Sequence, residues 1–133
     1  MGPRFLDLGE ILRIHHSLIE VYGGSDGVRD MGLLQSAIAM PMAAFGGQFL
    51  HEDIFEKAAA YLYHIVKNPP FVDGNKRTGA ASAIVFLAVN DVQIANDEDA
   101  LVELTLGIAE GNVDKQQVAS FFRRHARPLG EGE

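Results

Sequence analysis

A run of nine residues, from Phe71 to Gly79, combines side chains of the types that bind phosphate. It reads FVDGNKRTG and is followed by the most apolar stretch of the chain, Ala80 to Val89. This order predicts a tight loop that opens a buried helix, with Lys76 and Arg77 in the first turn. Cations are disfavoured there, because a helix N-terminus already carries partial positive charge. Each misplaced cation costs roughly 0.3–1 kcal/mol at an exposed site.

A bound anion would offset that cost. Free backbone N–H groups and the helix dipole both favour negative charge at a helix N-terminus. Asp73, just before the cations, is of the type that holds a magnesium ion beside phosphates. The run therefore predicts a phosphate site, such as that of a nucleotide. The plainer alternative is an ordinary turn in which Asn75 caps the helix and the cations face water.

The run resembles the motif of the Fic and death-on-curing superfamily. The Fic branch has the form H-P-F-x-D/E-G-N-G-R-x-x-R, and the death-on-curing branch has H-x-F-x-D/N-A/G-N-K-R. The second form is matched by Phe71, Asp73, Gly74, Asn75, Lys76 and Arg77. Ala80 stands where the Fic branch has its second arginine. Further similarity extends over the N-terminal part of the chain, for example at Tyr22-Gly23-Gly24 and at Phe45-Gly46-Gly47.

One departure from the motif concerns the catalytic base. In the family, a histidine two residues before the phenylalanine removes the proton from the target hydroxyl. In this chain that position is Pro69. Proline has no titratable group and no N–H donor, so it cannot act as a base. We therefore expect the activity that the resemblance implies to be severely impaired.

The resemblance implies a role for each residue of the motif. Asp73 is expected to hold Mg²⁺ or to orient the substrate. The backbone at Gly74 and Asn75, with the side chains of Lys76 and Arg77, is expected to grip the phosphates of ATP. Lysine at the position of Lys76 is typical of the death-on-curing branch, in which the γ-phosphate is transferred to a threonine of elongation factor Tu. The expected partner is a small antitoxin protein, whose disordered tail folds onto the toxin.

Three functions stay open at this point. The first is a death-on-curing toxin, with phosphoryl transfer as its ancestral activity. The second is AMP transfer of the Fic type. The third is a binding module that holds a nucleotide or a protein and transfers nothing. Labelled ATP and mass spectrometry of the target distinguish them, because the two modifications differ in mass and a binding module gives neither.

Composition agrees with one domain over residues 1–133. The hydrophobic content of 47% is too high for disorder, and 133 residues suffice for one core. No apolar run reaches the roughly 20 residues that cross a bilayer, so no membrane contact is expected. The lack of a secretory signal and of cysteine fits a cytoplasmic protein. A net charge of −7 argues against direct nucleic-acid binding.

Apolar periodicity predicts an all-α fold with six helices, and the resemblance implies a single-domain Fic-like helical bundle. The expected helices cover 11–22, 31–40, 54–65, a segment that begins at Asn75 or Lys76 and ends near Asn90, a segment between Asn96 and Gly111, and 114–125. The fourth, which follows the motif loop (residues 69–79), should be the buried central helix. Gly79 and Ala83 should let a neighbouring helix approach it closely. Gln93 to Ala95 is expected to form a short extended piece.

Other candidate positions carry weaker signals. The glycine-rich segment from Ala43 to Glu52 is expected to be either the flap that docks the target polypeptide in the family or a mobile connector. His51, near this segment, is interpreted as a surface loop histidine, and His64 as a packing or boundary residue. His15 and His16 are adjacent, so they point to different faces of a helix and make a poor metal pair.

Overall fold

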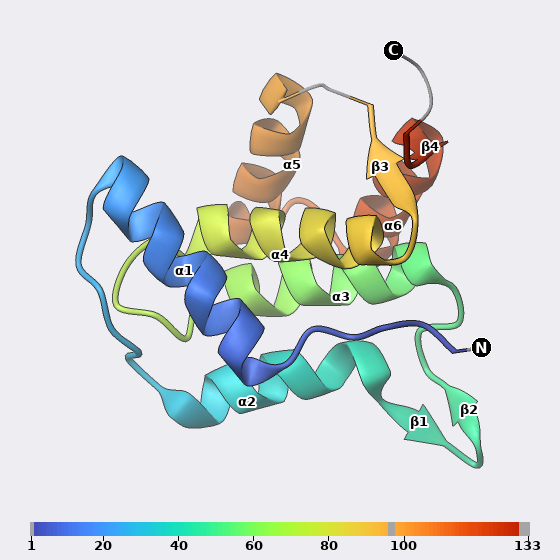
Figure 1. Ribbon diagram of the computed structural model, residues 1–133, viewed down its shortest axis with the longest axis horizontal. Coiled ribbons are helices and arrows are strands. Elements are labelled where there is room, and N and C mark those ends of the chain that lie inside the picture. The colour runs from blue at the N-terminus through green and yellow to red at the C-terminus, as the bar shows by residue number, and fades with distance from the viewer. Residues whose placement is uncertain (1, 96–97, 131–133) are drawn as a thin grey trace.

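The computed structural model describes residues 2–95 and 98–130, and in these residues the fold is mainly helical (Figure 1). The predicted all-α class is confirmed, with each helix within a few residues of its expected position. The helices are α1 (Leu8–Tyr22), α2 (Met31–Ala39), α3 (Ile54–Lys67), α4 (Asn75–Val89), α5 (Glu98–Glu110) and α6 (Lys115–His125). A short 3₁₀ helix, η1 (Met40–Met42), follows α2. Asn96 and Asp97, expected at the start of α5, lie outside the described residues.

Aspartate side chains begin four of these helices. Asp7, Asp30, Asp53 and Asp114 each accept a hydrogen bond from the backbone N–H three residues further on. Such caps satisfy donors that have no partner inside the helix. The start of α4 differs, because it follows Gly74 and no capping side chain accepts a hydrogen bond from its N–H groups.

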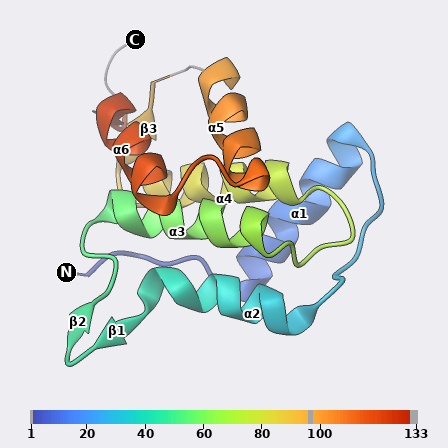
Figure 2. The ribbon, with the colours of Figure 1, turned by 180° about the vertical axis from the view of Figure 1, so that it is seen from behind.

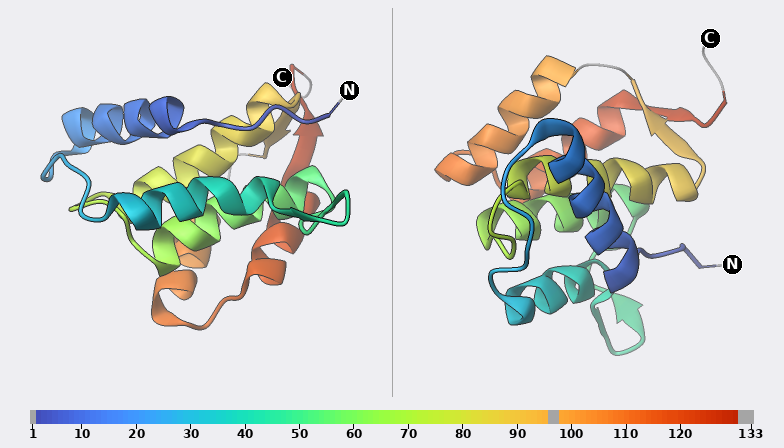
Figure 3. Two further views of the ribbon diagram at one scale, coloured as in Figure 1. Left: turned by 90° about the horizontal axis from the view of Figure 1, so that it is seen from below. Right: turned by 60° about the vertical axis from the view of Figure 1, so that its left-hand side comes forward.

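Two helices, α3 and α4, share the centre of the molecule (Figures 1 and 2). The prediction named α4 alone, but α3 carries more fully buried side chains, among them Tyr61 and Leu62. Gly79 of α4 faces α3, and a Cβ atom there would lie 3.1 Å from Val66 and 3.2 Å from Leu62. Its lack of a side chain therefore allows the close helix contact that the sequence predicts. Figure 3 shows α1 and α2 on one side of this pair and α5 and α6 on the other.

Two small antiparallel sheets complete the described structure. β1 (Ala44–Phe45) and β2 (Gln48–Phe49) form a hairpin within the predicted flap or connector segment. β3 (Val92–Ile94) pairs with β4 (Ala126–Pro128), so the expected extended piece is confirmed one residue earlier. The sequence analysis did not predict β4. None of the described helices is long and apolar enough to cross a membrane.

Candidate functional site

The first part of the motif loop joins α3 to α4 and lies against the segment that joins α1 to α2. Val28 pairs with Phe71 in an isolated antiparallel bridge. The Pro70 carbonyl accepts hydrogen bonds from the N–H groups of Arg29, at 2.7 Å, and Asp30, at 3.0 Å. The loop therefore has a fixed backbone path, although it lies outside regular secondary structure.

Asn75 fixes the same loop from the other end. Its Oδ1 accepts a hydrogen bond from the Phe71 N–H at 2.9 Å, and its Nδ2 donates to the Phe71 carbonyl at 3.1 Å. The alternative reading of Asn75 as the cap of α4 is wrong, because Asn75 is the first helical residue. Gly74 holds the cap position instead, with a left-handed φ of 75° that favours glycine.

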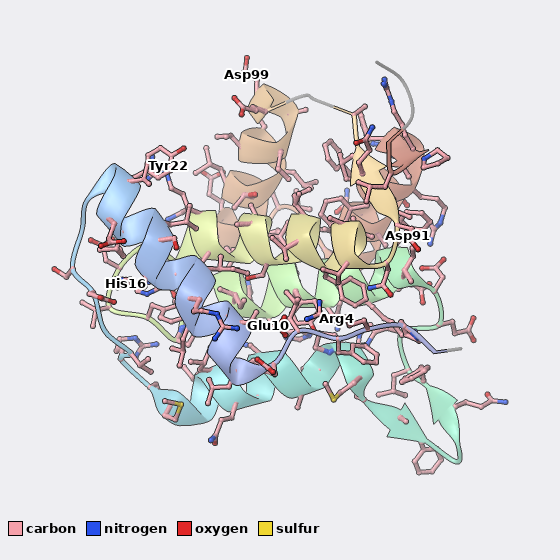
Figure 4. The ribbon with its side chains drawn as sticks, in the orientation of Figure 1. Arg4, Glu10, His16, Tyr22, Asp91 and Asp99 are labelled. Atoms are coloured by element: carbon pink, nitrogen blue, oxygen red, sulfur yellow. The ribbon has the colours of Figure 1, made fainter. Side chains whose placement is uncertain are left out.

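The first turn of α4 carries Lys76 and Arg77, as predicted, and both side chains are exposed. Tyr22 lies at the end of α1 (Figure 4). The Arg77 guanidinium lies 4.3 Å from the centre of the Tyr22 ring. This cation–π contact orients Arg77 along the surface. A helix start without a capping side chain, next to two cations, has the electrostatics of an anion-binding site.

Asp73 precedes this turn, and its carboxylate is held by backbone groups. Oδ1 accepts from the Gly74 N–H at 2.9 Å, and Oδ2 accepts from the Ser25 N–H at 3.3 Å. Gly24 has a φ of 110°, which favours glycine, and a Cβ atom there would lie only 2.8 Å from Oδ2, so a side chain at this position would displace the carboxylate. In the described residues no group of three or more potential ligands could hold a metal ion. Asp73 suits Mg²⁺ as a single protein ligand, since this ion commonly takes its other ligands from phosphates and water.

Pro69 lies between the end of α3 and the loop, at the position of the family's base. Its carbonyl accepts a hydrogen bond from the Arg29 guanidinium. The side chain of Pro69 offers no proton acceptor, so the site has phosphate-binding features without the expected base.

Two other histidines, His51 and His64, contact Lys115 of α6. The Lys115 Nζ lies 3.0 Å from the His51 Nε2 and 2.9 Å from the His64 Nε2. Burial lowers the pKa of His64 to about 4, and the charge of Lys115 is the second cause. The same two causes also lower the pKa of His51. The interpretation of His51 as a surface residue is wrong, because only 9% of it is exposed. His64 packs at a helix boundary, as expected.

The sequence analysis missed the contact of His15 with the motif loop. His15 is buried, its ring stacks on Phe71, and its Nε2 lies 2.8 Å from the Asp73 carbonyl oxygen. A signal was present, since His15 falls on the apolar stripe of the first predicted helix together with Ile11. A histidine on a buried helix face needs a polar partner, but the sequence does not show which one.

Together, the helical fold and the glycine-opened loop before α4 define a Fic-type architecture with a candidate phosphate site. The sequence profile of the Fic/DOC family matches residues 5–87 of the chain. The chain therefore belongs to the Fic/DOC family.

Two relatives place it on the Doc branch of that family. Over 121 residues the chain is 35% identical to "Protein kinase doc" of Escherichia phage P1. This match covers 91% of this chain and 94% of that protein. Over 78 residues it is 46% identical to "Toxin Doc" of Mycolicibacterium smegmatis. The latter match covers 59% of this chain and 60% of that protein.

Proposed function

We propose that this chain is a Doc-type toxin whose ancestral activity is transfer of a phosphoryl group from ATP to a protein hydroxyl. The observation that carries the proposal is the start of α4, where uncapped N–H groups stand beside Lys76 and Arg77. The likeness to a relative named as a protein kinase, over nearly the whole chain, supports it. The expected target is elongation factor Tu, a translation protein of the cytoplasm.

In this proposal the residues of the motif loop bind and orient the nucleotide. The backbone at Gly74 and Asn75 and the ammonium of Lys76 contact the phosphates, and Arg77 stays against Tyr22 until a phosphate draws it away. Asp73 would hold Mg²⁺, which neutralises charge on the phosphates when it is bound. The site has room for this role, because both oxygens of Asp73 keep lone pairs beyond their single hydrogen bonds.

Pro69 limits the chemistry that this chain performs. The target hydroxyl must lose its proton as it attacks, and a positioned base contributes typically 10²–10⁴-fold to the rate. His51 and His64 are engaged with Lys115, so neither is free to supply the base. We expect the native chain to bind ATP and to transfer phosphate at a severely reduced rate.

One alternative is favoured by a specific observation. Pro69 fits a binding module that holds a nucleotide or a protein without transferring anything. AMP transfer is the other alternative, and Lys76 weighs against it, because the Fic branch has glycine at that position. Both alternatives keep the same loop and differ in the product.

A mainly apolar cavity of about 590 Å³ between α1, α4 and α5, which Lys76 and Arg77 of the motif also line, suits the antitoxin. Its walls include Tyr22, Val102 and Leu106, which are exposed apolar side chains. Such a groove fits the apolar face of a peptide that folds into a helix on binding. A Leu106→Glu variant should therefore lose co-purification with the small protein that the native chain recovers. Recovery by both chains would place the partner elsewhere.

The β1–β2 hairpin is the proposed docking site for the target protein. Phe45, next to the turn, is 84% exposed, and Leu50, just after β2 at the other end of the hairpin, is also exposed. A short hairpin with free backbone edges can pair with an extended peptide. This assignment corresponds to the flap expected from the family.

The test of the proposed function is the Pro69→His variant. It should restore the base and modify elongation factor Tu in the presence of ATP and Mg²⁺, with a mass increase of one phosphoryl group. It should also arrest bacterial growth, while the native chain expresses without harm. Pro69→Ala is the control, since it frees the backbone without adding a base. A mass increase of AMP would favour the Fic activity, and an unmodified target would favour the binding module.

A further inference from the structure

His15 lies in the middle of α1 and is 2% exposed. Its ring stacks on the Phe71 ring with a centroid distance of 3.8 Å and an angle of 6° between the planes. Its Nε2 lies 2.8 Å from the backbone oxygen of Asp73. A carbonyl only accepts hydrogen bonds, so Nε2 must carry the hydrogen. The contact therefore fixes both the ring plane and the proton position.

The second ring nitrogen of His15 faces a carboxylate. Nδ1 lies 3.6 Å from Oδ1 of Asp26, which is too long for a direct hydrogen bond. Asp26 also accepts hydrogen bonds from the His16 Nδ1, at 2.8 Å, and from the Gly27 N–H, at 2.9 Å. The hydrogen bond from His16 is the main cause that lowers the pKa of Asp26, which is ionised at neutral pH. At 3.6 Å this carboxylate influences the ring less than the 2.8 Å contact of Nε2 with the Asp73 carbonyl, which sets the position of the hydrogen on Nε2.

The carbonyl that His15 holds belongs to the peptide that enters Gly74. Gly74 adopts a φ of 75°, and its own carbonyl accepts the Thr78 N–H at 3.0 Å, which closes the first turn of α4. A Cβ atom on Gly74 would lie 3.2 Å from Ile19 and 3.7 Å from the His15 Nε2. The start of α4 thus packs directly against α1, and the hydrogen bond from His15 to the Asp73 carbonyl connects the two.

We propose that His15 is a positioning residue for the phosphate site. By holding the Asp73 carbonyl, its Nε2–H fixes the peptide plane that leads into α4 and so the direction of the uncapped N–H groups of the first turn. The phosphate itself is contacted by those N–H groups and Lys76, not by His15. This inference rests on the proposed nucleotide site, and it adds α1 to the elements that build that site.

Two variants of His15 distinguish the effect of its hydrogen-bond donor from that of its aromatic ring. His15→Phe keeps a ring that stacks on Phe71 but removes the donor, and His15→Gln keeps an N–H donor without the ring. We expect His15→Phe to weaken ATP·Mg²⁺ binding about tenfold, the loss typical of one buried hydrogen bond. His15→Gln should stay within about threefold of the native affinity. Calorimetric titration measures the affinity, and thermal melting checks that each variant folds.

A matched control exists on α6. His125 stacks on Phe121 with a centroid distance of 4.2 Å and hydrogen-bonds to the Phe121 carbonyl at 2.8 Å. His125→Phe removes the same kind of bond far along the chain, and it should leave the ATP affinity within about twofold. In His125→Phe, the amide resonances of Lys76 and Arg77 should match those of the native chain. In His15→Phe, the same resonances should shift.

Three results would overturn the inference. One is a folded His15→Phe with native affinity and native amide resonances at Lys76 and Arg77. Another is a His15→Gln that binds as poorly as His15→Phe, because the ring would then act through packing alone. The third comes from the unmodified protein, if ¹⁵N spectra place the hydrogen of His15 on Nδ1 instead of Nε2. If the native chain binds no ATP, the proposed function fails, while the amide resonances and the His15 tautomer still decide whether His15 holds the start of α4.

Discussion

Two regions of this molecule use histidine in opposite ways. Beside the motif loop, the hydrogen bond that His16 donates to Asp26 and the charge of Glu20 raise the pKa of His16. At the base of the β1–β2 hairpin, burial and the charge of Lys115 lower the pKa values of His51 and His64. One region therefore favours the protonated imidazole and the other the neutral one. The same residue type responds to its partner and its burial, which sequence alone does not show.

At the base of the β1–β2 hairpin, a buried lysine fixes the segment that leads into α3. Lys57 is 2% exposed, and it donates to the carbonyls of His51, at 2.5 Å, and Glu52, at 3.0 Å. Its ammonium also lies 4.1 Å from the centre of the Phe49 ring. Perturbed pKa values often mark functional sites, but structural networks perturb them too. The lowered pKa of His64 belongs to such a network, whereas the proposed phosphate site rests on the uncapped start of α4.

The largest effect of a substitution on folding is expected at Asn75. Asn75→Ala removes both hydrogen bonds to Phe71 and should lower the free energy of unfolding by about 2 kcal/mol, at roughly 1 kcal/mol for each bond. Asn75→Asp keeps the acceptor for the Phe71 N–H but loses the donor. Its free energy of unfolding should therefore lie between those of Asn75→Ala and the native chain. Urea denaturation at constant pH measures both. Equal stability of all three proteins would show that the loop does not depend on the two hydrogen bonds between Asn75 and Phe71.

The second prediction concerns acid stability at the hairpin base. The pKa of His64 is about 4 in the folded chain and about 6.5 when unfolded, so the unfolded state binds more protons between these values. The contribution of His64 is fully present above about pH 6.5 and is lost as the pH falls toward about 4. His64→Gln keeps an acceptor for Lys115 and does not titrate. Its free energy of unfolding should fall less steeply than that of the native chain over this range. Parallel pH profiles of the two proteins would contradict the lowered pKa.

The smallest effect is expected at His16, and it has the opposite sign. Its pKa is raised in the folded chain, so its stabilising contribution is present below about pH 6.5 and is lost as the pH rises through the folded value. The side chain is exposed, which limits the effect through solvent screening. His16→Gln should therefore cost most stability in mild acid and almost none in mild alkali. A cost that grows with pH would contradict this assignment.

The sequence predicted the elements of the candidate phosphate site better than the contacts that hold them. The placement of Lys76 and Arg77 at a helix start followed from the apolar stretch after them, because helix starts have local signals. The sequence leaves open whether Asn75 caps α4 or begins it, since asparagine is common both in turns and as a helix cap. The burial of His51 and the pairing of β4 with β3 depend on segments distant in the chain. Such contacts are set by tertiary packing, which local patterns do not encode.

The central claim is that the start of α4 binds nucleotide phosphate although Pro69 replaces the base. Calorimetric titration of the native chain with ATP and Mg²⁺ tests it most directly, with Lys76→Ala and, as a control for an exposed helical cation, Arg124→Ala. We predict saturable binding by the native chain and Arg124→Ala, and at least about tenfold weaker binding by Lys76→Ala, because a charge-assisted contact is lost. Without ATP, Lys76→Ala should be more stable by a few tenths of a kcal/mol, as expected when a cation is removed from a helix N-terminus. No binding by the native chain, or equal binding by Lys76→Ala, would contradict the account.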